Sequence, residues 1–225
     1  MSALLPGIRD KVGGEQCVQD FLYLGPFPFP EGNQPRDHQP QRDWLGLPTG
    51  LDNLARIDTD AEVPVDPEKP QGRKLKWTRP FEGKWGRVDL KKPFKRQIEF
   101  ANGFMLTFVH SDAAAAARLW IGSDDGIAVW LNGKRVHALD IQRALTPDED
   151  LVEVALKPGW NPLLVRVSQG YGGWELALRI TDARGLPWPK QKIDPACGGQ
   201  PRPEIPVPAP VKEEKQEVRK EAAGR

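Results

Sequence analysis

The chain has 225 residues, enough for one large β domain or two small ones, and 39% of them are hydrophobic. Its formal net charge is +1, from 32 basic and 31 acidic residues, so the charge balance indicates no nucleic-acid partner and no anionic membrane surface. No apolar run approaches the roughly 18 residues that a membrane-spanning helix needs. The apolar run near the N-terminus is too short, and is broken too soon by Pro6, to predict a signal peptide.

The first part of the chain predicts little regular structure. Residues 1–16 are expected to be a loosely ordered leader. Residues 18–24 predict a strand that ends at Gly25-Pro26. Residues 31–74 are rich in Pro, Asp, Arg and Gln and predict a long irregular insertion, with a short helical turn near residues 51–57.

After Leu75 the pattern changes to short strands at the spacing of an all-β fold. Apolar residues alternate with polar ones in the last three of these strands, as in Trp174, Leu176, Leu178 and Ile180. One apolar face per strand favours two antiparallel sheets packed face to face. The predicted strands are 75–78, 85–90, 97–109, 116–121, 127–131, 134–139, 151–156, 163–168 and 174–181.

Turn residues agree with this division. Asn132-Gly133 suits a two-residue hairpin turn, because both positions accept a positive φ, and Pro158-Gly159 predicts another turn. The predicted β-sandwich therefore spans residues 17–186. Residues 187–225 predict a disordered, Pro-rich and charged tail.

Two cysteines, Cys17 and Cys197, flank the predicted sandwich. Because the two ends of a domain often lie close together, a disulfide between them is one interpretation. Two separate thiols are the other. Their spacing in the sequence excludes a zinc knuckle or a CxxC redox site.

The catalytic motifs that short sequence patterns reveal are absent, including GxSxG, HExxH, the Walker loop and GxGxxG. The three histidines of the chain are scattered, at positions 38, 110 and 137. The sequence therefore favours a protein that binds or assembles over an enzyme.

Residues 122–134 read GSDDGIAVWLNGK. This segment resembles the "SDDG…WLNGK" segment of two kinds of extracellular β-sandwich module: protective-antigen-like domains and the jelly-roll, galactose-binding-like modules of bacterial glycoside hydrolases. Residues 21–27 (FLYLGPF), 157–167 (KPGWNPLLVRV) and 173–180 (GWELALRI) resemble further strands of these modules, in the same order. Fold alone does not define function.

The resemblance implies an all-β jelly-roll fold, an extracytoplasmic location and a non-catalytic carbohydrate-binding role. In lectins of the protective-antigen-like group a pair of aspartates helps hold calcium, so Asp124 and Asp125 are candidate calcium ligands. Calcium needs six to eight oxygens, and Asn161 and the loop around Tyr171 are candidate further sources. The alternative is that Asp124 and Asp125 only form a tight turn.

Aromatic residues suggest a second way to bind sugars. Trp130 lies opposite its apolar neighbours in the predicted strand, as Trp120 does. An exposed Trp120 or Trp130 could stack on a sugar ring. The alternative is that the 31–74 insertion covers these tryptophans. Tyr171 is a candidate binding residue near a turn, and no stacking role is assigned to it, to Trp160 or to Trp188. Trp174 is expected in the core.

A structural subunit of a larger extracytoplasmic or membrane-associated complex is the rival function. Such a subunit would dock on its protein partners through the sandwich, with the extended segments as tethers. The partner predicted from the sequence is thus a glycan or a larger protein assembly.

Overall fold

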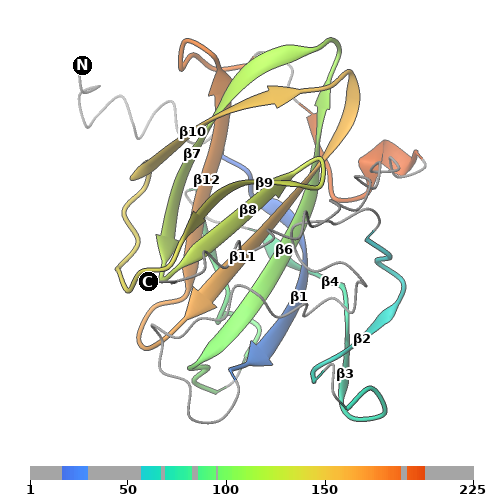
Figure 1. Ribbon diagram of the computed structural model, residues 1–225, viewed down its shortest axis with the longest axis vertical. Coiled ribbons are helices and arrows are strands. Elements are labelled where there is room, and N and C mark those ends of the chain that lie inside the picture. The colour runs from blue at the N-terminus through green and yellow to red at the C-terminus, as the bar shows by residue number, and fades with distance from the viewer. Residues whose placement is uncertain are drawn as a thin grey trace, which may run out of the picture.

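The computed structural model describes residues 17–29, 57–66, 69–82, 86–94, 96–188 and 192–200 (Figure 1). The predicted leader, most of the predicted insertion and the charged end of the tail lie outside these residues. Among the described residues no helix is long and apolar enough to span a membrane.

The strands form two antiparallel sheets that pack face to face (Figure 1). The larger sheet has the order β4-β1-β6-β11-β8-β9, with β13 also paired to β6, and the smaller sheet has the order β10-β7-β12-β5. A separate hairpin joins β2 to β3. The predicted all-β sandwich is confirmed.

The larger sheet contains β1 (Asp20–Pro28), β4 (Thr78–Glu82), β6 (Ala101–Ser111), β8 (Ile127–Leu131), β9 (Lys134–Leu139), β11 (Gly159–Gln169) and β13 (Lys192–Ile193). The smaller sheet contains β5 (Arg87–Asp89), β7 (Ala115–Asp124), β10 (Asp150–Leu156) and β12 (Glu175–Asp182). The hairpin consists of β2 (Glu62–Pro64) and β3 (Lys74–Lys76).

The main core lies between the two sheets. It contains the inward side chains that the period-two pattern predicts, including Leu176, Leu178 and Ile180 of β12, all at most 2% exposed. Trp174 is fully buried in the same cluster. Burial of these apolar side chains is the main driving force that holds the sheets together.

A second apolar cluster covers the outer face of the larger sheet. Its strand residues alternate with those of the main core, as Ala128 and Trp130 do in β8. Residues from outside the sheet pack over them, namely Ile57, Val63, Leu75, Trp77 and Cys197. The larger sheet is therefore buried on both faces, which explains why β6 and β11 contain few exposed side chains.

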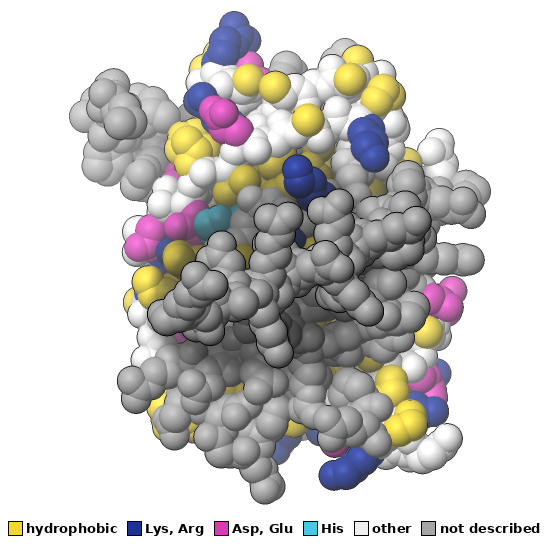
Figure 2. Space-filling model, viewed as in Figure 1, with side chains coloured by type: hydrophobic (Ala, Val, Ile, Leu, Met, Phe, Trp, Pro, Cys, Tyr) yellow, Lys and Arg dark blue, Asp and Glu magenta, His cyan; other side chains and the backbone are white. Residues whose placement is uncertain are grey.

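The described surface on the side shown in Figure 2 mixes Lys and Arg with Asp and Glu. No large patch of one charge is visible there, in agreement with the net charge of +1.

Several strand boundaries differ from the sequence prediction, for example at β6, which begins at Ala101 rather than at residue 97, and at β11, which begins at Gly159 rather than at residue 163. Gly25-Pro26 does not end β1, which continues to Pro28, because a register shift between Leu24 and Phe27 accommodates the proline within the pairing to β6. The regular structure also does not stop at residue 186, since β13 pairs with His110 and Val109 of β6.

The predicted turns are found where the sequence placed them. Asn132 and Gly133 join β8 to β9 with φ angles of 53° and 80°. Gly159 has a φ of 86° at the start of β11. These positive values explain the choice of Asn and Gly at these positions.

Of the two interpretations of Cys17 and Cys197, the structure has the one without a disulfide between them. Cys17 forms an isolated bridge with Arg179 of the smaller sheet, whereas Cys197 is buried in the cluster on the outer face of the larger sheet. The two residues follow the chain onto different layers of the fold, so closeness of the domain ends does not bring their sulfur atoms together.

Candidate functional site

One end of the sandwich gathers the loops that carry three of the five candidate residues. β7 ends there at Asp124, β11 ends at Gln169, and β6 begins at Ala101 (Figure 1). Strand pairing places Asp124 opposite Glu175, and Gln169 opposite Ala101. We call this region, formed by residues 96–101, 124–126, 140–145 and 169–175, the Asp124 end.

Asp125 fastens two loops to each other through its carboxylate. One oxygen, Oδ1, accepts a hydrogen bond from the backbone N–H of Arg143 at 3.1 Å. The other, Oδ2, accepts one from the backbone N–H of Gly170 at 2.6 Å. Asp125 is 5% exposed, and burial raises its pKa while the two N–H groups oppose that shift. Both hydrogen bonds come from residues far along the chain, 18 and 45 positions away, so the carboxylate links distant loops.

Asp124 is buried beside other carboxylates. Its side chain is 8% exposed, and burial, followed by the charges of Asp125 and Glu175, raises its pKa to about 6. Lys91 and a hydrogen bond from the backbone of Leu145 partly offset these effects. Gly173 lies against the Asp124 carboxylate so closely that any side chain there would overlap it.

An ion-pair network anchors the 140–149 loop beside the aspartates. Arg143 donates to both carboxylate oxygens of Asp150, at 2.6 and 3.2 Å, and also to the backbone oxygen and hydroxyl of Ser123. His137 Nε2 lies 3.3 Å from Asp150 Oδ2. Burial alone would raise the pKa of Asp150, but Arg143 outweighs it and holds that pKa below its usual value. His137 is therefore part of the network that holds the 140–149 loop in place.

At the Asp124 end, the carboxylates of the candidate calcium ligands already have other partners. Both carboxylate oxygens of Asp125 already accept backbone N–H groups, and the Lys91 ammonium donates to the Gly172 carbonyl next to Asp124. In the described part of the chain, no group of three or more His, Cys, Asp or Glu side chains could hold a metal ion. Calcium at Asp124 and Asp125 stays a prediction for experiment.

Tyr171 is the exposed aromatic residue of the Asp124 end. Its side chain is 59% exposed, and its ring packs edge-to-face on Phe100 with 4.5 Å between centroids. The backbone N–H of Phe100 donates to Gly170 at 3.2 Å, which ties the two aromatic segments together. A rigidly supported ring is thus open to solvent.

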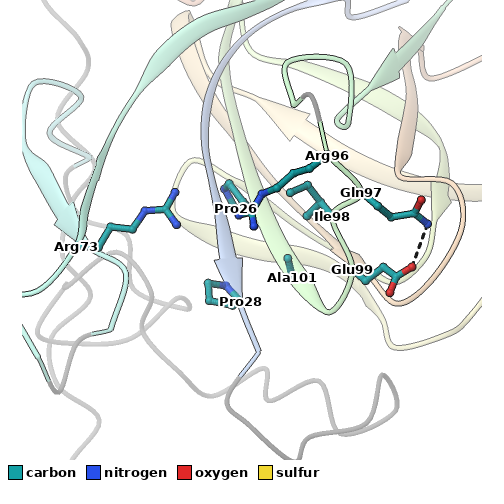
Figure 3. A pocket seen from close by; sticks show the side chains of 8 residues that line it. All are labelled: Pro26, Pro28, Arg73, Arg96, Gln97, Ile98, Glu99 and Ala101. Carbon is teal, nitrogen blue, oxygen red and sulfur yellow. Dashed lines mark hydrogen bonds between the residues drawn. The ribbon is translucent and has the colours of Figure 1, made fainter.

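An open pocket lies next to this aromatic pair (Figure 3). Its volume is about 190 Å³. The two basic side chains of its lining, Arg73 and Arg96, extend toward each other across Pro26. The lining residues are Pro26, Pro28, Arg73, Arg96, Gln97, Ile98, Glu99 and Ala101. No sequence pattern identified this pocket, because its residues come from three separate segments.

Two candidate residues lie away from the Asp124 end. Trp130 is 2% exposed in the outer-face cluster, so it cannot stack on a sugar. The alternative that the 31–74 insertion covers the tryptophans holds for Trp130, since Ile57 and Val63 pack in the same cluster. Trp120, in contrast, packs on the smaller sheet with Arg179 4.4 Å from its ring centroid.

Asn161 lies near the opposite end of β11 from Gly170 and is fully buried. Its amide nitrogen donates to the carbonyl oxygens of Val109, Lys157 and Gly159. Its amide oxygen accepts from Lys157 N and Asn132 Nδ2, both at 2.8 Å. The hydrogen-bonding groups of this side chain are all used within the two turns around residues 132 and 157–159, far from Asp124.

Comparisons with known proteins give weak similarities. No family model matches the chain, and no curated protein matches it. Solved structures with some similarity include the PA14 domain of the antifreeze protein MpAFP, at 16% identity and a TM-score of 0.33, covering 38% of this chain and 45% of that chain.

Two other structures cover more of this chain. An anti-sigma factor domain-containing protein is 11% identical with a TM-score of 0.40, over 86% of this chain and 51% of that chain. The PA14 sugar-binding domain from an RTX adhesin is 12% identical with a TM-score of 0.37, over 78% of this chain and 95% of that chain. The chain spans about half or less of the first two proteins, and the β-sandwich assignment rests on its own strands and sheets.

Proposed function

We propose that this chain is a non-catalytic carbohydrate-binding module of an extracytoplasmic protein, and that it binds sugars on the surface around Tyr171. The single observation that carries the proposal is the exposed Tyr171 ring held edge-on by Phe100. A sugar ring offers an apolar face to such an aromatic ring and keeps its hydroxyl groups for polar neighbours.

Polar groups suited to those hydroxyls lie around the ring. The Gly172 carbonyl and the Lys91 ammonium meet in a hydrogen bond at the same loop. Gln169 donates to the carbonyl oxygens of Ile98 and Gly172 and so fixes the base of the loop. The loop is therefore held in place by the fold, which lowers the entropy cost of binding.

A glycan array followed by titration of the best glycan tests the proposal. Tyr171→Ala should lower the affinity by about fivefold, since aromatic stacking contributes on the order of 1 kcal/mol. Leu186→Ala is the matched control, because Leu186 is also exposed, at 49%, and lies in a different turn. Equal affinities for all three proteins would remove Tyr171 from the site.

The calcium prediction is tested in the same assay. Binding is measured with calcium and with a chelator, for the unmodified protein and for Asp125→Ala. Chelator-sensitive binding that Asp125→Ala abolishes would support a calcium site. Chelator-resistant binding would leave the aspartates as loop-fastening residues.

The rival function, a structural subunit, is favoured by one observation. Leu151 on the edge strand β10 is 48% exposed and lies on the side of the strand away from the core. Co-purification with one protein in fixed stoichiometry, disrupted by Leu151→Asp, with no glycan signal on the array, would favour this function over sugar binding.

A further inference from the structure

The pocket beside the aromatic pair carries an unusual concentration of positive charge. Arg73 precedes β3 and Arg96 precedes β6, yet their guanidinium groups extend toward one another in Figure 3. Neither arginine forms an ion pair with an acidic side chain of the described residues. Two unneutralised guanidinium groups that converge on one pocket favour an anionic ligand.

Glu99 is the acidic residue of the pocket lining. Its carboxylate accepts a hydrogen bond from Gln97 at 2.9 Å, and Figure 3 shows both side chains extending away from Arg73. The lining thus carries two positive charges and one negative charge. The negative charge weakens an anion's binding without cancelling the attraction of the arginine pair.

The pocket and Tyr171 share a wall. Ile98, Glu99 and Ala101 line the pocket, and Phe100 between them contacts the Tyr171 ring. The carbonyl oxygen of Ile98 also accepts a hydrogen bond from Gln169, at the base of the Tyr171 loop. One extended ligand could therefore contact both surfaces.

The pocket is too small to hold such a ligand entirely. Its volume of about 190 Å³ lies below the roughly 300–1,000 Å³ of pockets that enclose small-molecule ligands. A single charged group with part of its ring fits this space better than an oligosaccharide does. The rest of the ligand would lie outside, on the side of Tyr171.

We propose that the module recognises acidic oligosaccharides, with a carboxylate or sulfate group held by Arg73 and Arg96 and a neighbouring sugar ring stacked on Tyr171. This inference rests on the proposed carbohydrate-binding function. A planar guanidinium forms paired, charge-assisted hydrogen bonds to carboxylate or sulfate oxygens, which a neutral hydroxyl group cannot match. The arginines would then set the charge preference and the tyrosine the general affinity.

The test is a set of titrations at pH 7 and low salt, with trigalacturonate, its neutral counterpart galactotriose, and inorganic sulfate. We expect the charged trisaccharide to bind at least tenfold more tightly than the neutral one. The double variant Arg73→Gln/Arg96→Gln should remove this difference between the two trisaccharides. Glu99→Gln should strengthen trigalacturonate binding.

Lys92→Gln is the matched control, since it removes one exposed positive charge outside the pocket lining. It should leave the ratio of the two affinities unchanged. Thermal unfolding of every variant shows whether a loss of binding reflects a loss of folding.

The outcomes separate the two proposals. If both trisaccharides bind equally and the arginine variants change nothing, the charge preference is overturned while carbohydrate binding stands. If sulfate binds through the arginines and neither trisaccharide binds, the pocket is a site for small anions, and both the proposed function and the acidic-saccharide inference fail. Charged-ligand binding that depends on both the arginines and Tyr171 supports both.

Discussion

Replacing Asp124 by asparagine should stabilise the protein at neutral pH and leave its stability nearly unchanged at pH 4. The carboxyl group is 8% exposed and its pKa rises to about 6 from an ordinary value of 3.8. The folded chain therefore holds a proton on Asp124 between these two values while the unfolded chain releases it.

The proton that the folded state holds on Asp124 determines the sign of the change in stability with pH. A group whose pKa is raised by folding stabilises the protein at low pH, and that stability is lost as the pH rises through the folded value. At pH 8 the unmodified protein keeps a buried, charged carboxylate near Asp125 and Glu175. Asparagine has a similar shape, can still accept the hydrogen bond from Leu145, and carries no charge.

The size of the effect follows from the same pKa values. A rise from 3.8 to about 6 corresponds to about 3 kcal/mol at most, at roughly 1.4 kcal/mol for each pKa unit. For a domain of this size, that free energy raises the melting temperature by about 6–12 °C. The measurement is thermal unfolding at intervals from pH 4 to pH 8, with a chelator present throughout.

Asp150→Asn is the matched control, with the opposite sign. Arg143 lowers the pKa of Asp150, so this carboxylate stabilises the fold at neutral pH and loses its effect as the pH falls. The variant should therefore be less stable than the unmodified protein at pH 8, with a smaller difference at pH 4. Parallel curves of melting temperature against pH for Asp124→Asn and the unmodified protein would refute the reasoning about Asp124.

Three further changes test the fold around the site. Trp130→Ala should cost about 3–5 kcal/mol in denaturant unfolding, because it leaves a cavity in the outer-face cluster, and should not change glycan affinity per folded molecule. Asn161→Ala should cost about 2–4 kcal/mol in the same assay, since it leaves buried backbone groups of two turns without partners. A reducing agent should leave the melting temperature unchanged, because Cys17 and Cys197 form no disulfide; a drop of several degrees would contradict that arrangement.

Local patterns were sufficient to predict the sandwich. Strands β8 and β9 begin and end where alternation and the Asn132-Gly133 turn placed them. Alternation identifies an inward face because adjacent side chains of a strand point to opposite sides. The inward burial of Leu176 and Leu178, on which the sandwich prediction depended, is confirmed.

Local sequence patterns could not predict which distant segments contact each other. The sequence offered cover of Trp130 by the 31–74 insertion only as one of two alternatives, and nothing near His110 indicates that β13 pairs beside it. An outward-facing tryptophan looks the same in sequence whether water or another segment lies over it.

The sequence predicted only part of the candidate site, because some of its residues meet through contacts between distant segments. Asp124, Asp125 and Tyr171 share one end of the sandwich because the ends of β7 and β11 meet there. Asn161 belongs to β11, which ends just before Gly170, but it lies near the other end of that strand, a distance that the motif itself does not reveal. Arg73 and Arg96 meet only through the folding of separate segments.

The cover over the larger sheet sets the limits within which this domain can be shortened. A fragment that begins after Leu75 would match the strand-rich part of the sequence, yet it would lose β1 as well as Ile57 and Val63, and would uncover Trp130, Phe104 and Phe108. An exposed apolar surface of this kind favours self-association, so we expect the fragment to aggregate when it is expressed. Recombinant versions should therefore retain residues 17–200, which keep β1 in the larger sheet and Ile57 and Val63 over its outer face.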